Sequence, residues 1–79
     1  MDQVKNQERR ITVDGKTITV KVLEDAAGHW LLEIVDEHGN STCWRDVFGT
    51  AQEAFNAAAI AVQEEGIEAF MGPAKIQKN

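Results

Sequence analysis

The 79-residue sequence has no tyrosine, one proline and one cysteine. It also lacks any apolar run near the roughly 20 residues that a membrane-spanning helix needs. A single cysteine, Cys43, excludes an internal disulfide and suits a reducing compartment. The polar start "MDQVKNQERR" does not have the apolar region of a signal peptide. We therefore expect a cytoplasmic protein that makes no contact with a membrane.

Positive charge is scarce. The chain has eight Lys and Arg residues against thirteen Asp and Glu residues, for a net charge of -5. Residues 8–72 retain five cations against twelve anions, a balance of -7. Phosphate backbones are repelled by such a surface unless its cations cluster, and here only Arg9 and Arg10 are adjacent. We therefore do not expect nucleic acid as a partner.

The residue patterns of common catalytic sites are missing. The sequence has no glycine-rich phosphate loop and no Ser-His-Asp set. His29, His38 and Cys43, with Asp36 and Glu37, do not have the spacing of a zinc site, and solvated turn histidines explain them. Cys43 as a nucleophile would need a nearby base and a group that stabilises the thiolate. We expect no enzyme activity, no metal and no cofactor.

The stretch "RRITVDGKTITVKVL" predicts a β-hairpin, because Asp14-Gly15 separates two alternating, β-branched runs. A two-residue loop pairs Val13 with Lys16 and Arg9 with Val20. The apolar side chains of both strands then share one face, as a correct register requires. That face carries Ile11, Val13, Ile18, Val20 and Val22, and the other carries Arg10, Thr12, Thr17, Thr19 and Lys21.

Two further strands follow, "GHWLLEIVD" and "STCWRDV". Facing Val22 with Leu32 places Trp30, Leu32 and Ile34 on the core side and pairs Lys21 with Glu33. The turn "DEHGNS" allows two registers. A three-residue loop, 37–39, puts Trp44 opposite Leu32, whereas a two-residue loop puts Cys43 there. We favour the first because Trp44 gains more from burial.

A helix is predicted over residues 51–65. Thr50 and Glu53 form a capping box in which each side chain satisfies the backbone N–H of the other residue. The predicted apolar stripe consists of Ala51, Phe55, Ala58, Ala59 and Val62, with Ala54 at its edge. Gly66 indicates the end of this helix. A helix continuing to Met71 is the alternative, and it would align Ile60, Ile67 and Met71 as a second apolar stripe.

These elements predict an α+β fold, in which a four-stranded antiparallel meander is followed by one helix packed on one sheet face (ββββα). The expected domain covers residues 8–72, between a flexible N-terminus at 1–7 and a flexible tail at 73–79. One helix leaves the other sheet face uncovered, and apolar residues there suggest a partner. The candidate interface consists of Leu23, Leu31, Glu33, Val35, Cys43 and Arg45.

The stretch "GHWLLEIVDEHGNSTCWRDVFGTAQEAFNAAA" resembles the small AP2-like or arm-type DNA-binding domains at the N-terminus of tyrosine integrases. The matching residues, in order, are Trp30, His38-Gly39-Asn40, Phe48-Gly49-Thr50 and Glu53-Ala54. The resemblance implies a small sheet with one packed helix. The layout is also similar to the partial double-stranded-RNA-binding fold of HicB-type antitoxins. The integrase domains read DNA with a sheet that is rich in Lys and Arg. The sheet predicted for this chain carries few cations and has Glu33 at its middle.

The function expected from these observations is a non-catalytic interaction module that binds a protein partner, or a second copy of itself, through the uncovered sheet face. The alternative is a nucleic-acid-binding or transcription- or antitoxin-associated module.

Overall fold

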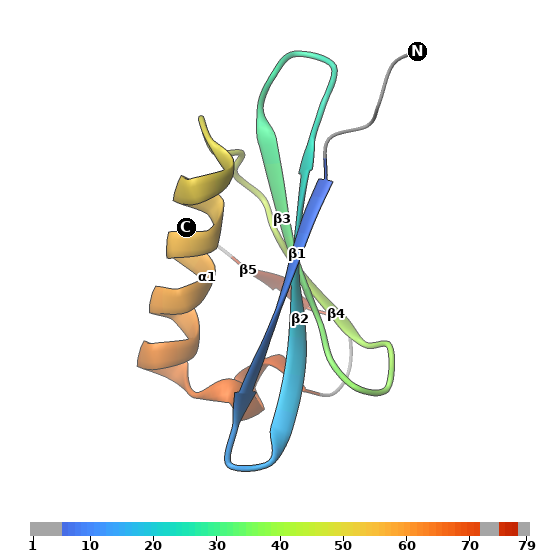
Figure 1. The fold of residues 1–79 in the computed structure, drawn as a ribbon, viewed down its shortest axis with the longest axis vertical. Coiled ribbons are helices and arrows are strands. Elements are labelled where there is room, and N and C mark those ends of the chain that lie inside the picture. Colours follow the sequence, from blue (N-terminus) through green and yellow to red (C-terminus); the bar gives the residue numbers. More distant parts are fainter. Residues whose placement is uncertain (1–5, 72–74, 78–79) are drawn as a thin grey trace.

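The computed structural model describes residues 6–71 and 75–77. One helix lies across one face of a five-stranded sheet of order β1-β2-β3-β4-β5 (Figure 1). The predicted α+β meander with one packed helix is confirmed. The strands are β1 (Asn6–Val13), β2 (Lys16–Glu24), β3 (Trp30–Val35), β4 (Ser41–Trp44) and β5 (Lys75–Gln77), and the helices are α1 (Ala51–Glu65) and a short 3-10 helix, η1 (Ile67–Phe70).

The predicted hairpin register of β1 and β2 is confirmed, with Val13 paired to Lys16 and Arg9 to Val20. Asp14 and Gly15 have φ angles of +54° and +77°. Positive φ at both loop positions is the requirement of a type I′ turn, and glycine meets it without a steric cost. In the next pair of strands Lys21 lies opposite Glu33, as predicted.

The three-residue loop between β3 and β4 is also confirmed. Cys43 pairs with Glu33, and the Asp36 N–H donates to the Asn40 carbonyl at 2.8 Å. Asp36 itself is buried, although the sequence pattern did not predict this. Its Oδ1 accepts from the N–H groups of His38 and Asn40, and its Oδ2 accepts from the Asn40 side chain. These bonds fix the loop and compensate for the burial of a charge.

Strand pairing extends past both expected domain boundaries. β1 begins at Asn6, inside the segment that we expected to precede the domain. Lys75–Gln77, within the expected tail, pair in parallel with β4, and Ile76 stands opposite Cys43 in the register. The remaining residues of the two expected flexible segments, 1–5, 73–74 and 78–79, lie outside the described residues, as does residue 72.

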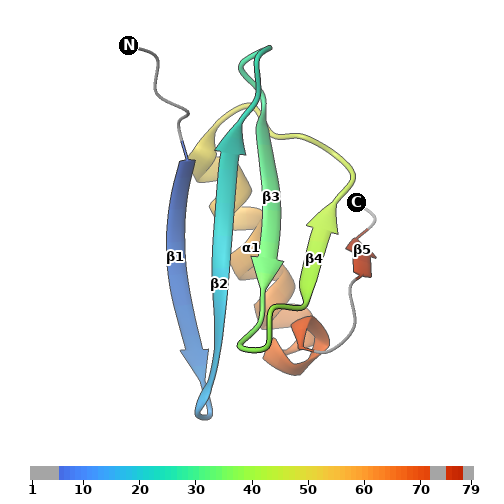
Figure 2. The ribbon, with the colours of Figure 1, turned by 90° about the vertical axis from the view of Figure 1, so that its right-hand side faces the viewer.

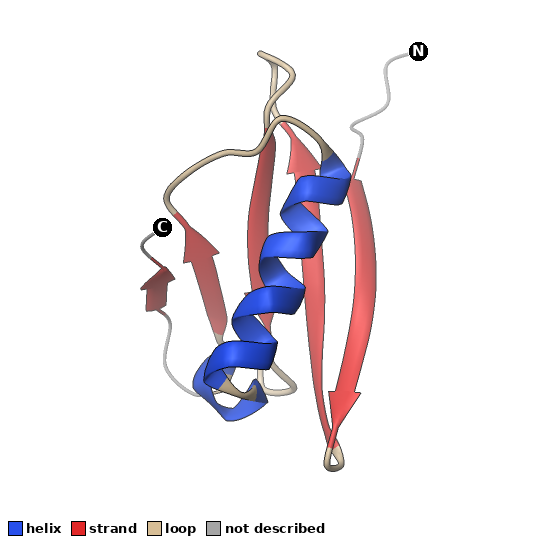
Figure 3. Cartoon of the chain, turned by 90° about the vertical axis from the view of Figure 1, so that its left-hand side faces the viewer, coloured by secondary structure: helices blue, strands red, loops and turns tan. Residues whose placement is uncertain are grey.

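The core lies between α1 and the central strands. α1 runs diagonally over the sheet and packs on β2 and β3 (Figure 3). The predicted stripe is shifted around the helix: Ala54 is fully buried and Ala61 is buried, whereas Ala59 is exposed. Ala59 instead lines a groove together with Ile11 and Val13 of β1, at the margin of the core. The buried apolar set is Ile18, Val20, Val22, Leu32, Ile34, Ala54, Phe55, Ala58, Ala61, Ile67 and Phe70.

Both ends of α1 are set by local chemistry. The Thr50 hydroxyl accepts from the Glu53 N–H at 3.0 Å, as predicted. The Glu53 carboxylate accepts from the Gly49 N–H at 3.0 Å instead of that of Thr50. At the other end Gly66 has a φ of +88° and donates to the Val62 carbonyl at 2.8 Å. The helix therefore stops at Glu65, and the alternative that continued to Met71 is wrong.

Replacing Thr50 with Ala should lower the free energy of unfolding by about 1 kcal/mol, because the Glu53 N–H loses its acceptor. Thr50→Ser keeps a hydroxyl and should stay close to wild type. Chemical denaturation followed by circular dichroism measures both variants. Equal unfolding midpoints for Thr50→Ala and wild type would show that the cap contributes nothing.

Candidate interaction surface

The sheet face opposite α1 is not covered by any described element (Figure 2). The Oγ1 atoms of Thr12 and Thr17, which lie 2.9 Å apart, belong to this face. We call it the open face and define it by the residues that alternate with the core positions. These are Asn6, Glu8, Arg10, Thr12, Thr17, Thr19, Lys21, Leu23, Leu31, Glu33, Val35, Ser41 and Cys43.

Five of the six predicted interface residues fall on the open face, namely Leu23, Leu31, Glu33, Val35 and Cys43. Leu31 and Cys43 are exposed, and the other three are half-buried. Arg45 is exposed, but β4 ends at Trp44, so strand alternation does not assign Arg45 to either face.

Arg45 and Asp46 form a bulge between two stretches that pair with β3. Cys43 pairs with Glu33, whereas Phe48 exchanges both backbone hydrogen bonds with Trp30, at 2.8 and 2.9 Å. On β3, two residues lie between Trp30 and Glu33. On the partner segment, four residues lie between Cys43 and Phe48. The two extra residues bend the chain away from β3 before it enters α1.

The bulge adds an apolar residue that the sequence pattern did not identify. Because Phe48 returns to Trp30, the preceding residue, Val47, is brought alongside Leu31. Leu31 in turn pairs with Leu23 on β2. The side chains of Leu31 and Val47 are 41% and 43% exposed. The structure shows that Phe48 pairs with β3 again, but the strand periodicity from Ser41 onward does not predict this pairing.

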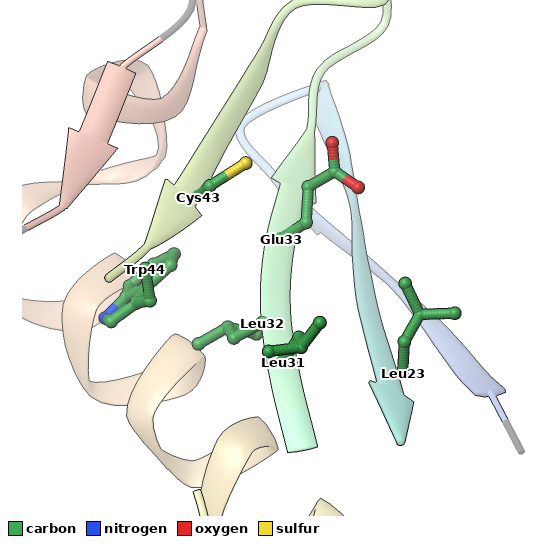
Figure 4. A pocket seen from close by; sticks show the side chains of 6 residues that line it. All are labelled: Leu23, Leu31, Leu32, Glu33, Cys43 and Trp44. Carbon is green, nitrogen blue, oxygen red and sulfur yellow. The ribbon is translucent and has the colours of Figure 1, made fainter. Parts of the chain in front are cut away.

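A pocket of about 220 Å³ lies beside this apolar row (Figure 4). Leu23, Leu31, Glu33 and Cys43 line it from the open face. Leu32 and Trp44, which point toward the helix, also line it, because the chain leaves β3 just after Trp44. Trp44 is half-buried, and its ring stacks on Phe70 with centroids 6.0 Å apart. The pocket therefore reaches from the open face to the edge of the core.

The charges of the open face alternate in sign. Glu8, Lys21 and Glu33 follow one another across three strands. Within the residues that the structure describes, the ion pairs are Lys16–Glu68 at 3.2 Å and His29–Asp25 at 3.9 Å, so the Glu33 carboxylate at the pocket rim forms no ion pair there, although Lys21 lies opposite it in the register. Its negative charge is available to a ligand.

The groups considered for catalysis do not converge. His29 lies beside Asp25 at one end of β3, and His38 lies in the loop at the other end. Over residues 6–71 and 75–77, no group of three or more His, Cys, Asp or Glu side chains is close enough to hold a metal ion. Cys43 is exposed and its thiol is free.

Known proteins offer no guide to the role of this surface. The chain matches no protein-family model, no curated protein and no solved structure at a significant level. Among the described helices, none has the length and apolar content that crossing a membrane would take.

Two substitutions in β3 test which face is core. Leu31→Lys should leave the domain folded with an unfolding free energy within about 1 kcal/mol of wild type, because Leu31 is not part of the core. Leu32→Lys, one residue away on the buried face, should prevent cooperative folding because it buries an unpaired charge. Circular dichroism and thermal melting measure both. Unfolding of Leu31→Lys would contradict the assignment of the faces.

Proposed function

We propose that this chain is a non-catalytic, cytoplasmic interaction module that binds an apolar segment of a partner protein through the open face. The pocket that Leu23 and Leu31 line on the open face carries this proposal. Binding energy at protein interfaces is concentrated in a few anchor side chains that fill such pockets. A single apolar side chain of a partner matches a pocket of about 220 Å³.

Energetics support an anchor at this position. Fully burying a leucine or valine side chain stabilises by about 1.5–3 kcal/mol relative to exposure. Leu31 and Val47 do not obtain that stabilisation in the monomer, and Leu23 obtains it only in part. A partner that covers the row of Leu23, Leu31 and Val47 would supply what α1 cannot, because α1 lies on the other face.

The charge at the pocket rim indicates the chemistry of the partner. Glu33 lines the pocket and forms no ion pair among the described residues. A Lys or Arg next to the apolar anchor of the partner would pair with it. A net charge of -5 on this chain favours encounter with a basic segment.

A nucleic-acid role has less support. Arg10 and Lys21 lie on the open face, but Glu8 and Glu33 alternate with them in the registers. Phosphate contacts need a cluster of cations, and this arrangement does not form a continuous basic stripe.

Capture from a lysate of the native host, with three immobilised forms of the chain, tests the protein-binding role. We expect wild type and Ile60→Lys to retain the same protein and Leu31→Lys to lose it. Ile60 is the matched control because it is 53% exposed and lies on α1, across the molecule from the open face. The retained protein is then purified and titrated against all three forms by calorimetry. Equal affinity for wild type and Leu31→Lys would contradict the proposal.

Affinity for duplex or single-stranded DNA and RNA should be about 10⁻⁴ M or weaker at physiological salt, the weak end of non-specific binding. Fluorescence anisotropy with labelled oligonucleotides at several salt concentrations measures this. A micromolar dissociation constant that weakens with salt would favour the nucleic-acid role instead.

A further inference from the structure

β1 forms one edge of the sheet, and nothing in the described chain pairs with its outer side (Figure 2). The strand has eight residues, all paired to β2 in one uninterrupted register. It therefore has neither the bulge nor the proline that commonly blocks an exposed edge. The opposite edge, β5, has only three residues.

The hydrogen-bond pattern identifies which β1 residues point outward. The N–H of Asp25, directly after β2, donates to the His29 carbonyl at 2.8 Å, and the Thr17 N–H is also directed to that side, where it donates to Glu37. Odd-numbered residues of β2 therefore bond toward β3, and even-numbered ones bond toward β1. The β1 partners of the even-numbered residues are odd-numbered. The backbone groups left facing the free edge belong to Asn6, Glu8, Arg10 and Thr12.

Two of these four residues carry opposite charges. If a second β1 pairs antiparallel with the first, so that Glu8 faces Arg10 of the second copy, both pairs around the twofold axis are attractive. Both residues have outward backbone groups, so each pair also exchanges two hydrogen bonds. Shifting the register by two residues either way places Glu8 against Glu8 or Arg10 against Arg10. The charge pattern thus selects one register.

Repulsion between the two Arg9 side chains opposes this arrangement, and a contact within each copy reduces it. The axis lies beside Arg9, so the two Arg9 residues face each other. The Arg9 guanidinium carbon, however, lies 4.1 Å from the centroid of the Phe55 ring of its own α1. That cation–π contact draws the charge back over the helix and away from the axis.

The helix side of the same edge is incompletely covered. Ile11 and Val13 line a groove of about 460 Å³ with residues of α1 and η1, and Val13 is 39% exposed. In the selected register Gln7 of the second copy stands opposite Ile11, so the added strand extends over this side. An interface of one strand pair is small, which fits a reversible association.

We propose that two copies of the chain associate through antiparallel pairing of β1 with β1, with Glu8 of each copy facing Arg10 of the other. The surface is distinct from the pocket of the open face. The result is one continuous ten-stranded sheet, with the order of five strands repeated about the axis.

Sedimentation equilibrium of the full chain over a concentration series tests this inference. The mass should rise from 8.7 kDa toward twice that value in the micromolar range. Arg10→Glu places like charges opposite each other twice and should weaken the association at least about tenfold. The double variant Glu8→Arg/Arg10→Glu restores both attractive pairs and should regain most of the affinity.

Arg45→Glu is the matched control, because it reverses an exposed cation that follows β4, on the other side of the sheet from the β1 edge. It should associate like wild type, and circular dichroism confirms that every variant is folded. A monomer at all concentrations would overturn the proposal, as would a dimer that Arg10→Glu does not weaken. A dimer lost in Leu31→Lys but kept in Arg10→Glu would move self-association to the open face. The β1 proposal would then be wrong, while the role of the open face would stand.

Discussion

The packing of one helix on two central strands is the constraint on which the other features depend. α1 meets β2 and β3, and their apolar side chains meet its buried side at Ala54, Phe55 and Ala58. Small alanines let the helix approach the sheet closely, and Phe55 fills the remaining space. Residues 6–71 and 75–77 contain no second long helix for the other face. Both the open face and the exposed edge at β1 follow from this single layer of cover.

The connection from β4 to α1 resolves a geometric conflict within this arrangement. The chain must leave the sheet after Trp44 and reach the start of α1 at Ala51. On the way, Phe48 still pairs with Trp30. The bulge at Arg45-Asp46 supplies the extra length. Its consequence is the gap through which Leu32 and Trp44 become accessible from the open face. The candidate pocket is thus a by-product of turning the chain toward its helix.

Most of the fold was predictable because its signals are local. Strand alternation has a period of two, so a one-residue slip of the hairpin would place the apolar side chains of the two strands on opposite faces, and the two-residue Asp14-Gly15 turn fixes the register that keeps them together. Thr50 and Gly66 carry the chemistry of a helix start and a helix stop, and both operate as expected. Five of the six predicted interface residues fall on one face for the same reason, that alternation was correct up to Trp44.

The features that were missed depend on non-local geometry. Val47 joins the apolar row only because Phe48 returns to β3 after the bulge, and no periodicity in "CWRDVFG" marks that return. β5 is three residues long and pairs in parallel with a strand about 30 residues earlier. Parallel strands are not joined by a tight turn, so no hairpin signal in the sequence predicts this pairing. The buried stripe of the helix includes Ala61 instead of Ala59 because of where α1 crosses the sheet. Helical periodicity in the sequence does not specify where that crossing lies.

The edge and the open face also have a geometric relation. A twofold axis beside Arg9 and perpendicular to the sheet keeps both helices on one side and both open faces on the other. Each pocket is lined by residues of β2, β3 and β4 and by none of β1, so edge pairing would not cover it. Two copies would then present two pockets on one continuous surface. A partner with two suitably spaced anchors would gain affinity from the second contact without any new chemistry, since that contact becomes intramolecular. Weak self-association at the edge would in this way raise the affinity of an open face whose individual pocket is small.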